Sequence, residues 1–250
     1  NDSPALKKAD VGFAMGSGTE VAKEAGDITI LDDNFKSIAK AILYGRTMFK
    51  SIRKFLVFQL TVNVAAVLIC FLGPLFGENV ILTVIQLLLI NLAMDTLAAI
   101  AFGTEPPRQA YMNEKPIPRD EGIITPSMLS DILIGAAYIT VICLAVLFVP
   151  KIRGLFGNVD MMYLKTALFA TFMMAITFNG LGMASSRNCV LTMLFIFVLQ
   201  WVFIEFGGEV LSVEALSLDS WLNCFVLAVL VVPVKKLIQF GIAKYKASKA

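Results

Sequence analysis

The chain has 250 residues, of which 58% are hydrophobic and only 16% are charged. Soluble domains are about 45–50% apolar and about 25% charged, so this composition excludes an ordinary soluble domain and indicates a polytopic membrane protein. The formal net charge is only +2, and we expect no nucleic-acid partner. The chain has no histidine and its four cysteines form no CxxC pair, which excludes His-ligated zinc and imidazole chemistry within these residues.

The first 34 residues differ from the rest and predict the end of a cytosolic α/β domain. Two short apolar runs, 11–15 and 28–31, are typical of buried strands, and a glycine turn and a helical stretch over 19–25 separate them. Strand, turn, helix and strand is the order of an α/β unit. The Gly16-Ser-Gly18 turn fits either a phosphate cradle or a tight βα turn, and we favour the tight turn.

Residues 35–54 have apolar residues at helical spacing with basic residues between them. No Pro or Gly lies between Arg46 and the start of the following apolar run. We therefore expect a cytosolic stalk helix over 35–54. Such a helix either transmits motion between the α/β domain and the membrane or lies at the lipid headgroups as a simple amphipathic stalk. The pattern does not decide between these two roles.

Six apolar stretches follow, each about long enough to cross a bilayer as a helix. They lie near residues 55–76, 80–102, 129–149, 162–184, 188–206 and 220–242, with a tail over 243–250. With the N-terminus in the cytosol, 18 of the 21 Lys and Arg residues fall in cytosolic segments. This positive-inside pattern predicts that both termini are cytosolic. The proline-rich stretch 103–126 is expected to be an irregular cytosolic connector.

Asp95 lies in the middle of the second span, where a charge costs at least about 2.5 kcal/mol and is rarely found without a function. Asn91, four residues earlier, shares its face in a regular helix. In the first span Gln59, Thr61 and Asn63 are polar, and Asn63, the deepest, is a possible third oxygen donor. Because Ca²⁺ takes about six to eight oxygens, these side chains form half of a hard-cation site. A hydrogen bond that only joins helices is the alternative.

The other acidic residues of the spans lie near the predicted membrane surfaces. We expect Asp131, Glu205 and Glu209 to be interfacial rather than functional. The basic residues over 235–249 are expected to anchor the chain at anionic lipid on the cytosolic side.

Three stretches of the chain resemble P-type cation-transporting ATPases. Residues 1–16 are similar to the run that follows the glycine-rich hinge motif of this family. The sequence Asn91-Leu-Ala-Met-Asp95, with Thr-Glu-Pro-Pro over 104–107, resembles the sixth membrane helix of the plasma-membrane calcium pumps. Residues 206–208 and 216–221 resemble the loop between the last two helices of the same subfamily. The resemblance covers essentially the whole chain.

The resemblance implies that the six spans are the last six of ten. It implies that residues 1–34 close a phosphorylation domain with a Rossmann-type, haloacid-dehalogenase-like (HAD-like) fold. Asn1 and Asp2 match the Asn-Asp pair that helps to hold Mg²⁺ at the aspartyl phosphate. The phosphorylated Asp and the ATP-binding domain belong to an N-terminal part of the same pump that these residues do not include. We therefore expect that this fragment alone does not hydrolyse ATP.

The resemblance also implies a site for transported Ca²⁺ built by Asn91, Asp95 and a glutamate on a helix outside this chain. Two-site pumps carry a carboxylate where this chain has Ala66, and another in the helix that matches the fourth span. Since both are absent, we predict one Ca²⁺ per cycle, and Asn63 would belong to the neighbourhood of the absent second site. Secretory-pathway pumps typically have Gly-Pro after the aspartate, whereas Thr96 and Leu97 follow here, which favours the plasma-membrane type.

The predicted function is thus ATP-driven export of Ca²⁺ across the plasma membrane, with Mg²⁺ and ATP acting in the intact chain. One alternative is a secretory-pathway-type Ca²⁺/Mn²⁺ pump. A second is a cation transporter that does not use ATP, although such folds usually show inverted repeats and Gly- or Pro-broken helices at the site, and neither is evident here. A third is a purely structural membrane bundle. Expected partners are Ca²⁺ and the lipid bilayer; calmodulin is not expected to bind within these residues.

Overall fold

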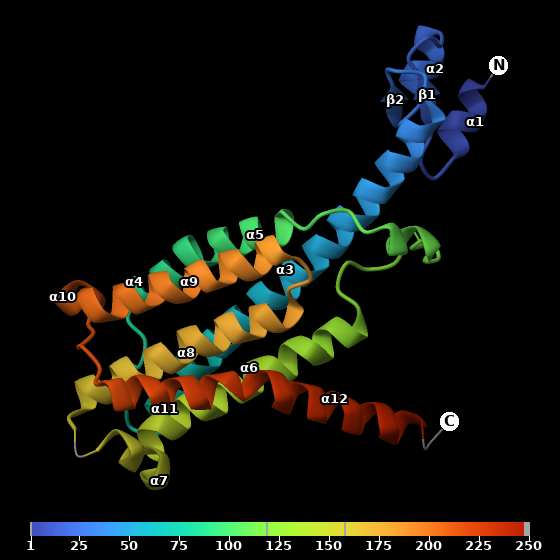
Figure 1. Cartoon of the computed structure of the whole chain (residues 1–250). Helices are drawn as coiled ribbons and strands as arrows, with labels where there is room; N and C mark the ends of the chain where they lie inside the picture. The colour runs from blue at the N-terminus through green and yellow to red at the C-terminus, as the bar shows by residue number, and fades with distance from the viewer. Residues whose placement is uncertain (1, 119, 158, 248–250) are drawn as a thin grey trace. The chain divides into compact units, whose positions relative to one another are not determined.

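The computed structural model describes residues 2–118, 120–157 and 159–247. The chain divides into two compact units, drawn in Figure 1 with their helices and strands labelled. Unit 1 comprises Asn1–Lys50 and Pro106–Ile123, and unit 2 comprises Ser51–Glu105 and Ile124–Ala250. The long helix α3 (Phe35–Leu75) is continuous and contributes residues to both units.

Unit 1 contains a small parallel βαβ element, as the sequence predicts. Strand β1 (Phe13–Met15) pairs with β2 (Ile28–Ile30), and Ala14 lies opposite Thr29. The crossover is helix α2 (Glu20–Ala25), and helix α1 (Ser3–Lys8) precedes the first strand. Two parallel strands cannot be joined by a hairpin, so the intervening helix is what allows this pairing.

The glycine turn after β1 binds its own chain. Gly16 N–H donates to the carbonyl of Ile30 at 2.7 Å, and Ser17 N–H donates to Asp33 Oδ1 at 3.0 Å. The Ser17 N–H also holds the pKa of the Asp33 carboxyl below its usual value. A Cβ at Gly16 would lie 2.9 Å from the carbonyl oxygen of Leu31, so glycine is needed for this close approach. This geometry supports the tight-turn interpretation rather than a phosphate cradle.

The connector in unit 1 is irregular apart from the 3₁₀ helix η2 (Gln109–Asn113). Arg46 of α3 holds the connector in place: its Nη1 donates hydrogen bonds to the carbonyls of Tyr111 at 2.7 Å and Glu114 at 2.8 Å. Lys50 forms an ion pair with the Glu114 carboxylate and lies over the Tyr111 ring. A charged lysine over an aromatic face is a stabilising cation–π arrangement.

Unit 2 is a bundle of long helices. Within the described residues, six helices are long and apolar enough to cross a membrane: Phe35–Leu75, Val84–Gly103, Pro126–Phe148, Met161–Met183, Arg187–Phe206 and Leu218–Lys244. Each overlaps one of the predicted spans. The predicted fold class, an α-helical polytopic membrane protein preceded by an α/β tail, is confirmed.

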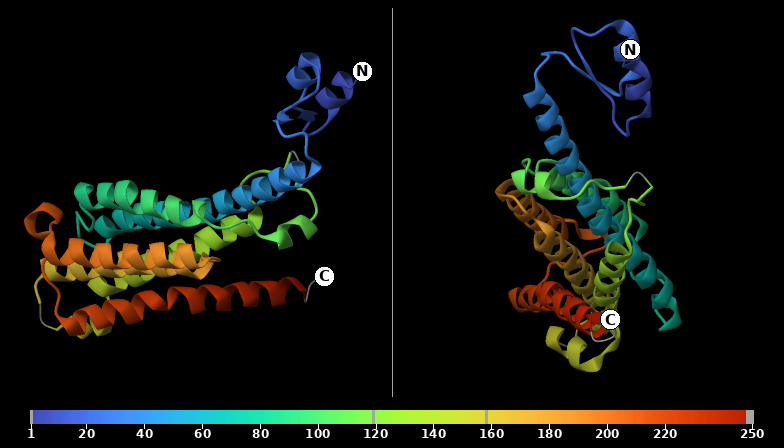
Figure 2. Two further views of the ribbon diagram at one scale, coloured as in Figure 1. Left: turned by 45° about the horizontal axis from the view of Figure 1, so that its top comes forward. Right: turned by 90° about the vertical axis from the view of Figure 1, so that its right-hand side faces the viewer.

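The bundle helices are α4 (Val84–Leu89), α5 (Asp95–Gly103), α6 (Pro126–Phe148), α8 (Met161–Met183), α9 (Arg187–Phe206), α11 (Leu218–Val229) and α12 (Val231–Ala247). Short pieces join them: α7 (Pro150–Arg153), η3 (Gly154–Phe156) and α10 (Gly208–Leu211). The long helices of this unit lie alongside one another in both views of Figure 2. The sixth span is interrupted at Leu230, where α11 ends and α12 follows.

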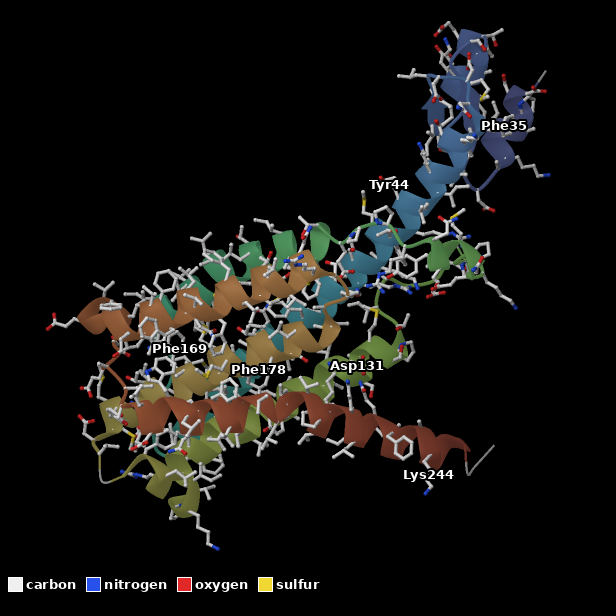
Figure 3. All side chains as sticks on the ribbon, in the orientation of Figure 1. Phe35, Tyr44, Asp131, Phe169, Phe178 and Lys244 are labelled. Atoms are coloured by element: carbon white, nitrogen blue, oxygen red, sulfur yellow. The ribbon has the colours of Figure 1, made fainter. Side chains whose placement is uncertain are left out.

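Helix α8 forms the centre of the bundle, in contact with α6, α9 and α11. Its apolar side chains are buried on every face, among them Phe169 and Phe172, both completely inaccessible. Phe178 of α8 (labelled with Phe169 in Figure 3) packs against rings of α9 and α11, with its centroid 5.9 Å from Phe197 and 5.1 Å from Phe225. A helix that is apolar all round is buried, so the sequence of this span accounts for its central place.

Gly180 allows α8 to approach its neighbours closely, and we expect Gly180→Ala to destabilise the bundle. A Cβ there would lie 2.9 Å from Met193 Sδ and 3.1 Å from Phe58 Cε2, and both side chains are buried. Overpacking of this kind costs about 1–3 kcal/mol, which should appear as a lower thermal-unfolding midpoint in detergent. Gly241→Ala in α12 is the control, because a Cβ there meets nothing within 4 Å. Equal drops for the two variants would contradict the argument.

Candidate functional site

Asp95 lies at an interruption of the second span. Helix α4 passes into a π-helical segment, η1 (Ile90–Met94), and α5 begins at Asp95. The Asp95 N–H donates to the carbonyl of Ile90, five residues back, instead of the residue four back. Segments of this kind occur frequently at functional sites. The helix is therefore continuous from Val84 to Gly103, but its regular α-helical hydrogen bonding is interrupted at the site without Gly or Pro. This differs from the regular helix that the sequence predicts.

The Asp95 carboxylate is buried, with 6% of the residue exposed. Its Oδ2 accepts a hydrogen bond from Gln59 Nε2 of α3 at 3.3 Å. Its Oδ1 is buried and, among the described residues, has no hydrogen-bond partner. An unpaired buried carboxylate oxygen is costly and calls for an explanation. A bound cation supplies one, because it would replace the missing donor.

The two asparagines of the predicted site are placed differently from Asp95. Asn91 is exposed, and Asn63 is half-buried. The structure joins neither of them to Asp95 by a hydrogen bond; the polar side chain that it brings to the carboxylate is Gln59. The depth of Asn63 in the first span favoured Asn63 over Gln59 as the predicted donor. Gln59 lies one helical turn before Asn63 and therefore on the same face of the helix, which is the signal that could have identified it.

The described residues contain no cluster of three or more His, Cys, Asp or Glu side chains placed to hold a metal ion. The polar side chain bonded to the Asp95 carboxylate is the neutral amide of Gln59. Because Ca²⁺ takes about six to eight oxygens, Asp95 needs further donors to hold this ion. The half-site expected from the sequence stays a prediction.

Asn1 and Asp2, the expected supports of Mg²⁺, are remote from the Asp95 site in sequence, and Asp2 lies in unit 1. Asn1 is outside the described residues. Asp2 is exposed at the N-cap of α1; its carbonyl accepts from Leu6 N–H at 2.9 Å, while its carboxylate makes no cap hydrogen bond.

Of the three acidic residues expected at the membrane surfaces, Glu209 is exposed, and Asp131 and Glu205 take ordinary polar partners. Asp131 of α6 (Figure 3) accepts a hydrogen bond from Gln239 of α12. Glu205 accepts from Trp221 Nε1 at 3.2 Å. Such partners are typical of structural polar groups rather than of an open cation site.

Two charged residues that the sequence did not single out are buried in unit 2. Glu105, directly after α5, accepts from Lys54 Nζ at 2.6 Å and from Ser185 N–H at 2.9 Å. Lys235 of α12, expected to be a basic anchor, is 9% exposed and donates to Asn179 Oδ1 of α8 at 3.2 Å. Their burial depends on which helices meet, and nothing in the local sequence signals it.

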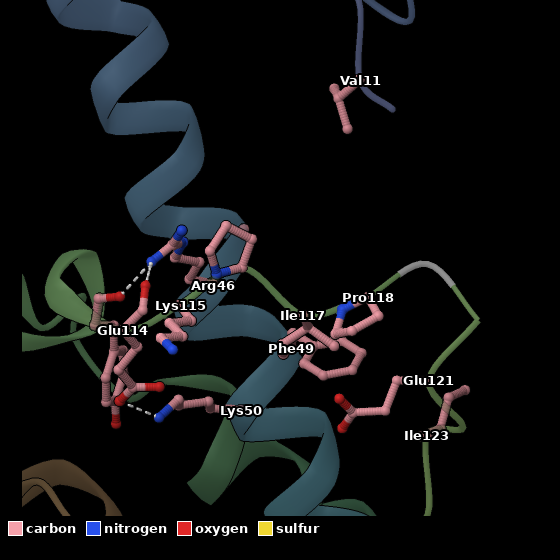
Figure 4. A pocket seen from close by; sticks show the side chains of 13 residues that line it. Val11, Arg46, Phe49, Lys50, Glu114, Lys115, Ile117, Pro118, Glu121 and Ile123 are labelled. Carbon is pink, nitrogen blue, oxygen red and sulfur yellow. Dashed lines mark hydrogen bonds and ion pairs between the residues drawn. The ribbon is translucent and has the colours of Figure 1, made fainter. Parts of the chain in front are cut away.

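Unit 1 has a hollow of about 560 Å³ between α3 and the connector, lined by apolar residues such as Phe49, Ile117 and Pro118 (Figure 4). Of its charged residues, Arg46 is bonded to the connector backbone and Lys50 is paired with Glu114. Lys115 and Glu121 also line the hollow.

Known proteins provide a comparison for this geometry. A family model described as "Cation transporting ATPase, C-terminus" matches residues 79–240. The chain is 41% identical over 253 residues to the plasma membrane calcium-transporting ATPase 3 of Homo sapiens, covering 92% of this chain and 20% of that protein. It is 40% identical over 250 residues to the plasma membrane calcium-transporting ATPase mca-1 of Caenorhabditis elegans, covering 91% and 20%. The chain thus spans about a fifth of the length of these relatives.

Proposed function

Because the chain belongs to the cation-transporting ATPase family, whose C-terminal region it matches, we propose that it forms part of an ATP-driven pump that exports Ca²⁺. The observation that carries this proposal is the buried Asp95 carboxylate, which has an unpaired oxygen at a π-helical segment in a membrane-spanning helix. The names of its relatives, plasma membrane calcium-transporting ATPases, support Ca²⁺ as the cargo.

The site proposed for the transported ion consists of Asp95 and Asn91, with Asn63 as a possible further donor. The exposed side of Asn91 offers an amide oxygen to a segment beyond these residues, where the expected glutamate would complete the shell. A carboxylate fixed at mid-membrane depth attracts a divalent ion, and the π-helical turn widens the helix next to it. Thr96 and Leu97 after the aspartate favour the plasma-membrane type over the secretory-pathway type.

A single Ca²⁺ per cycle is proposed because α3 and α8, both within the described residues, contain no Asp or Glu. Ala66 of α3 is buried and apolar. On α8 the buried hydroxyls of Thr171 and Thr177 donate to carbonyls of their own helix at 2.8 and 3.0 Å, and Asn179 accepts from Lys235. These polar groups are engaged, and a site without anionic ligands holds a divalent ion weakly.

ATP and Mg²⁺ act, in this proposal, on parts of the pump beyond this fifth of its length. Asn1 and Asp2 would support Mg²⁺ at the aspartyl phosphate, where a cation offsets the charge of the transferred phosphoryl group. Both ends of the chain would lie in the cytosol, because 18 of its 21 basic residues then fall on that side.

The test uses membranes that contain the full-length pump, supplied with labelled ATP. We expect Ca²⁺ to trigger an acid-stable phosphoenzyme, and labelled Ca²⁺ to be occluded at about one ion per phosphoenzyme, since one carboxylate-based site is present. Mn²⁺, tested in parallel, should be a poorer trigger. Absence of a phosphoenzyme with any cation would contradict the pump, equal responses to Mn²⁺ would favour the secretory-pathway type, and two occluded ions would contradict the single site.

A further inference from the structure

Gln59 of α3 is fixed opposite Asp95 by the packing of two buried rings. The Phe58 and Phe102 rings, on α3 and α5, have centroids 5.9 Å apart, and each residue is at most 2% exposed. This contact packs the two helices against each other, and Gln59, next to Phe58 in the chain, places its Nε2 3.3 Å from Asp95 Oδ2. The buried ring pair thus supports the position of Gln59 beside the carboxylate.

The Gln59 amide has two ends with different chemistry. Its NH₂ group donates to Asp95, while its Oε1 receives no hydrogen bond within the part of the chain that the structure describes. Rotation about the last side-chain bond exchanges the two ends. An amide oxygen is an ordinary Ca²⁺ ligand, and an amide N–H is an ordinary partner of an empty carboxylate. One side chain can thus serve both states of the site.

We propose that Gln59 is a direct oxygen ligand of the transported cation, contributed by the first span of this chain. When the site is empty, its NH₂ group holds Asp95 Oδ2; when a cation enters, the amide rotates and its Oε1 joins Asp95 in the coordination shell. This assignment rests on the proposed function and adds an oxygen donor that the motif around Asn91 does not supply. It places the ligand of α3 one turn nearer the start of that helix than Asn63.

Asn63 is the competing ligand on the same helix. It lies four residues after Gln59 and so on the same face. However, the structure links Gln59 to the carboxylate and leaves Asn63 half-buried without a bond to it. If Gln59 is the ligand, Asn63→Leu should weaken Ca²⁺ binding less than Gln59→Leu does.

The experiment measures the Ca²⁺ dependence of phosphoenzyme formation by the full-length pump with Gln59→Leu and Gln59→Glu. Leucine removes both ends of the amide, and we expect the half-saturating Ca²⁺ concentration to rise by roughly 10-fold or more, as is typical when a group around a metal site is lost. Glutamate keeps an oxygen ligand and adds charge, so its half-saturating concentration should stay at or below the wild-type value. The maximal phosphoenzyme level at saturating Ca²⁺ should be kept in both variants.

A purely positioning role predicts the opposite order. If Gln59 only donates a hydrogen bond to Asp95, a second carboxylate beside it repels the first, and Gln59→Glu should be at least as damaging as Gln59→Leu. That order, or wild-type Ca²⁺ dependence in Gln59→Leu, would overturn the proposal.

Gln200→Leu is the matched control. Gln200 of α9 is completely buried and its Oε1 lies 3.2 Å from the Thr177 hydroxyl of α8, so the same substitution is made in a different pair of helices. Its Ca²⁺ dependence should equal that of the wild type. Phosphorylation by inorganic phosphate without Ca²⁺ reports folding in every variant. If the wild type itself shows no Ca²⁺ response, the proposed function fails. If the wild type responds to Ca²⁺ and Gln59→Leu has the same Ca²⁺ dependence, only the ligand assignment fails.

Discussion

Asp95→Asn is expected to abolish the Ca²⁺-dependent phosphoenzyme of the full-length pump over the concentration range in which the wild type responds. The substitution keeps the size of the side chain and one acceptor oxygen, but it replaces the other oxygen by an NH₂ group and removes the charge of this buried carboxylate. Since ligand charge tunes Ca²⁺ affinity over several orders of magnitude, we expect a loss of at least roughly 100-fold. The half-saturating Ca²⁺ concentration for phosphorylation by labelled ATP measures it.

Asp131→Asn is the control for this experiment. It makes the same chemical change in α6, at a carboxylate whose partner is Gln239 of α12. Its Ca²⁺ dependence should be that of the wild type. Phosphorylation by inorganic phosphate should survive in both variants. A normal Ca²⁺ response from Asp95→Asn would remove the central residue of the proposed site, whereas loss of the response in both variants would indicate a general effect of charge in the bundle.

Glu105→Ala is expected to cause the largest loss of stability. The Glu105 side chain is 4% exposed and joins Lys54 of α3 to Ser185, which lies between α8 and α9. Its removal leaves the Lys54 ammonium, on a side chain only 22% exposed, without its carboxylate. Breaking a buried pair in this way costs about 3–5 kcal/mol. Thermal unfolding of the detergent-solubilised protein should show a clearly lower midpoint.

Two further variants separate burial from charge in this prediction. Glu114→Ala breaks the Lys50–Glu114 pair, whose side chains are 33% and 49% exposed, and should cost less than about 1 kcal/mol. The double variant K54M/E105L replaces the buried pair by apolar side chains, which is often neutral, and should recover much of the lost stability. If Glu105→Ala and Glu114→Ala were equally mild, the buried pair would not hold these helices together.

The sequence by itself determined the features that depend on residue type and short-range pattern. The apolar stretches predict the membrane-spanning helices because length and hydropathy are enough to decide whether a segment suits a bilayer. The first residues predict the βαβ element because strand, glycine turn and helix are read locally. Asp95 is identified by its place in an apolar run, since a charge there is costly whatever surrounds it.

The tertiary structure decided which groups meet. The π-helical turn at Ile90–Met94 contains no Gly or Pro, so no residue pattern announces it. Gln59, rather than the deeper Asn63, bonds to Asp95, and the packing of Phe58 against Phe102 between α3 and α5 supports this position. Glu105 and Lys235 are buried because segments distant in sequence cover them. Hydropathy fixes how deep a residue lies in a span, but only the packing of the helices fixes the face it presents and the partner it finds.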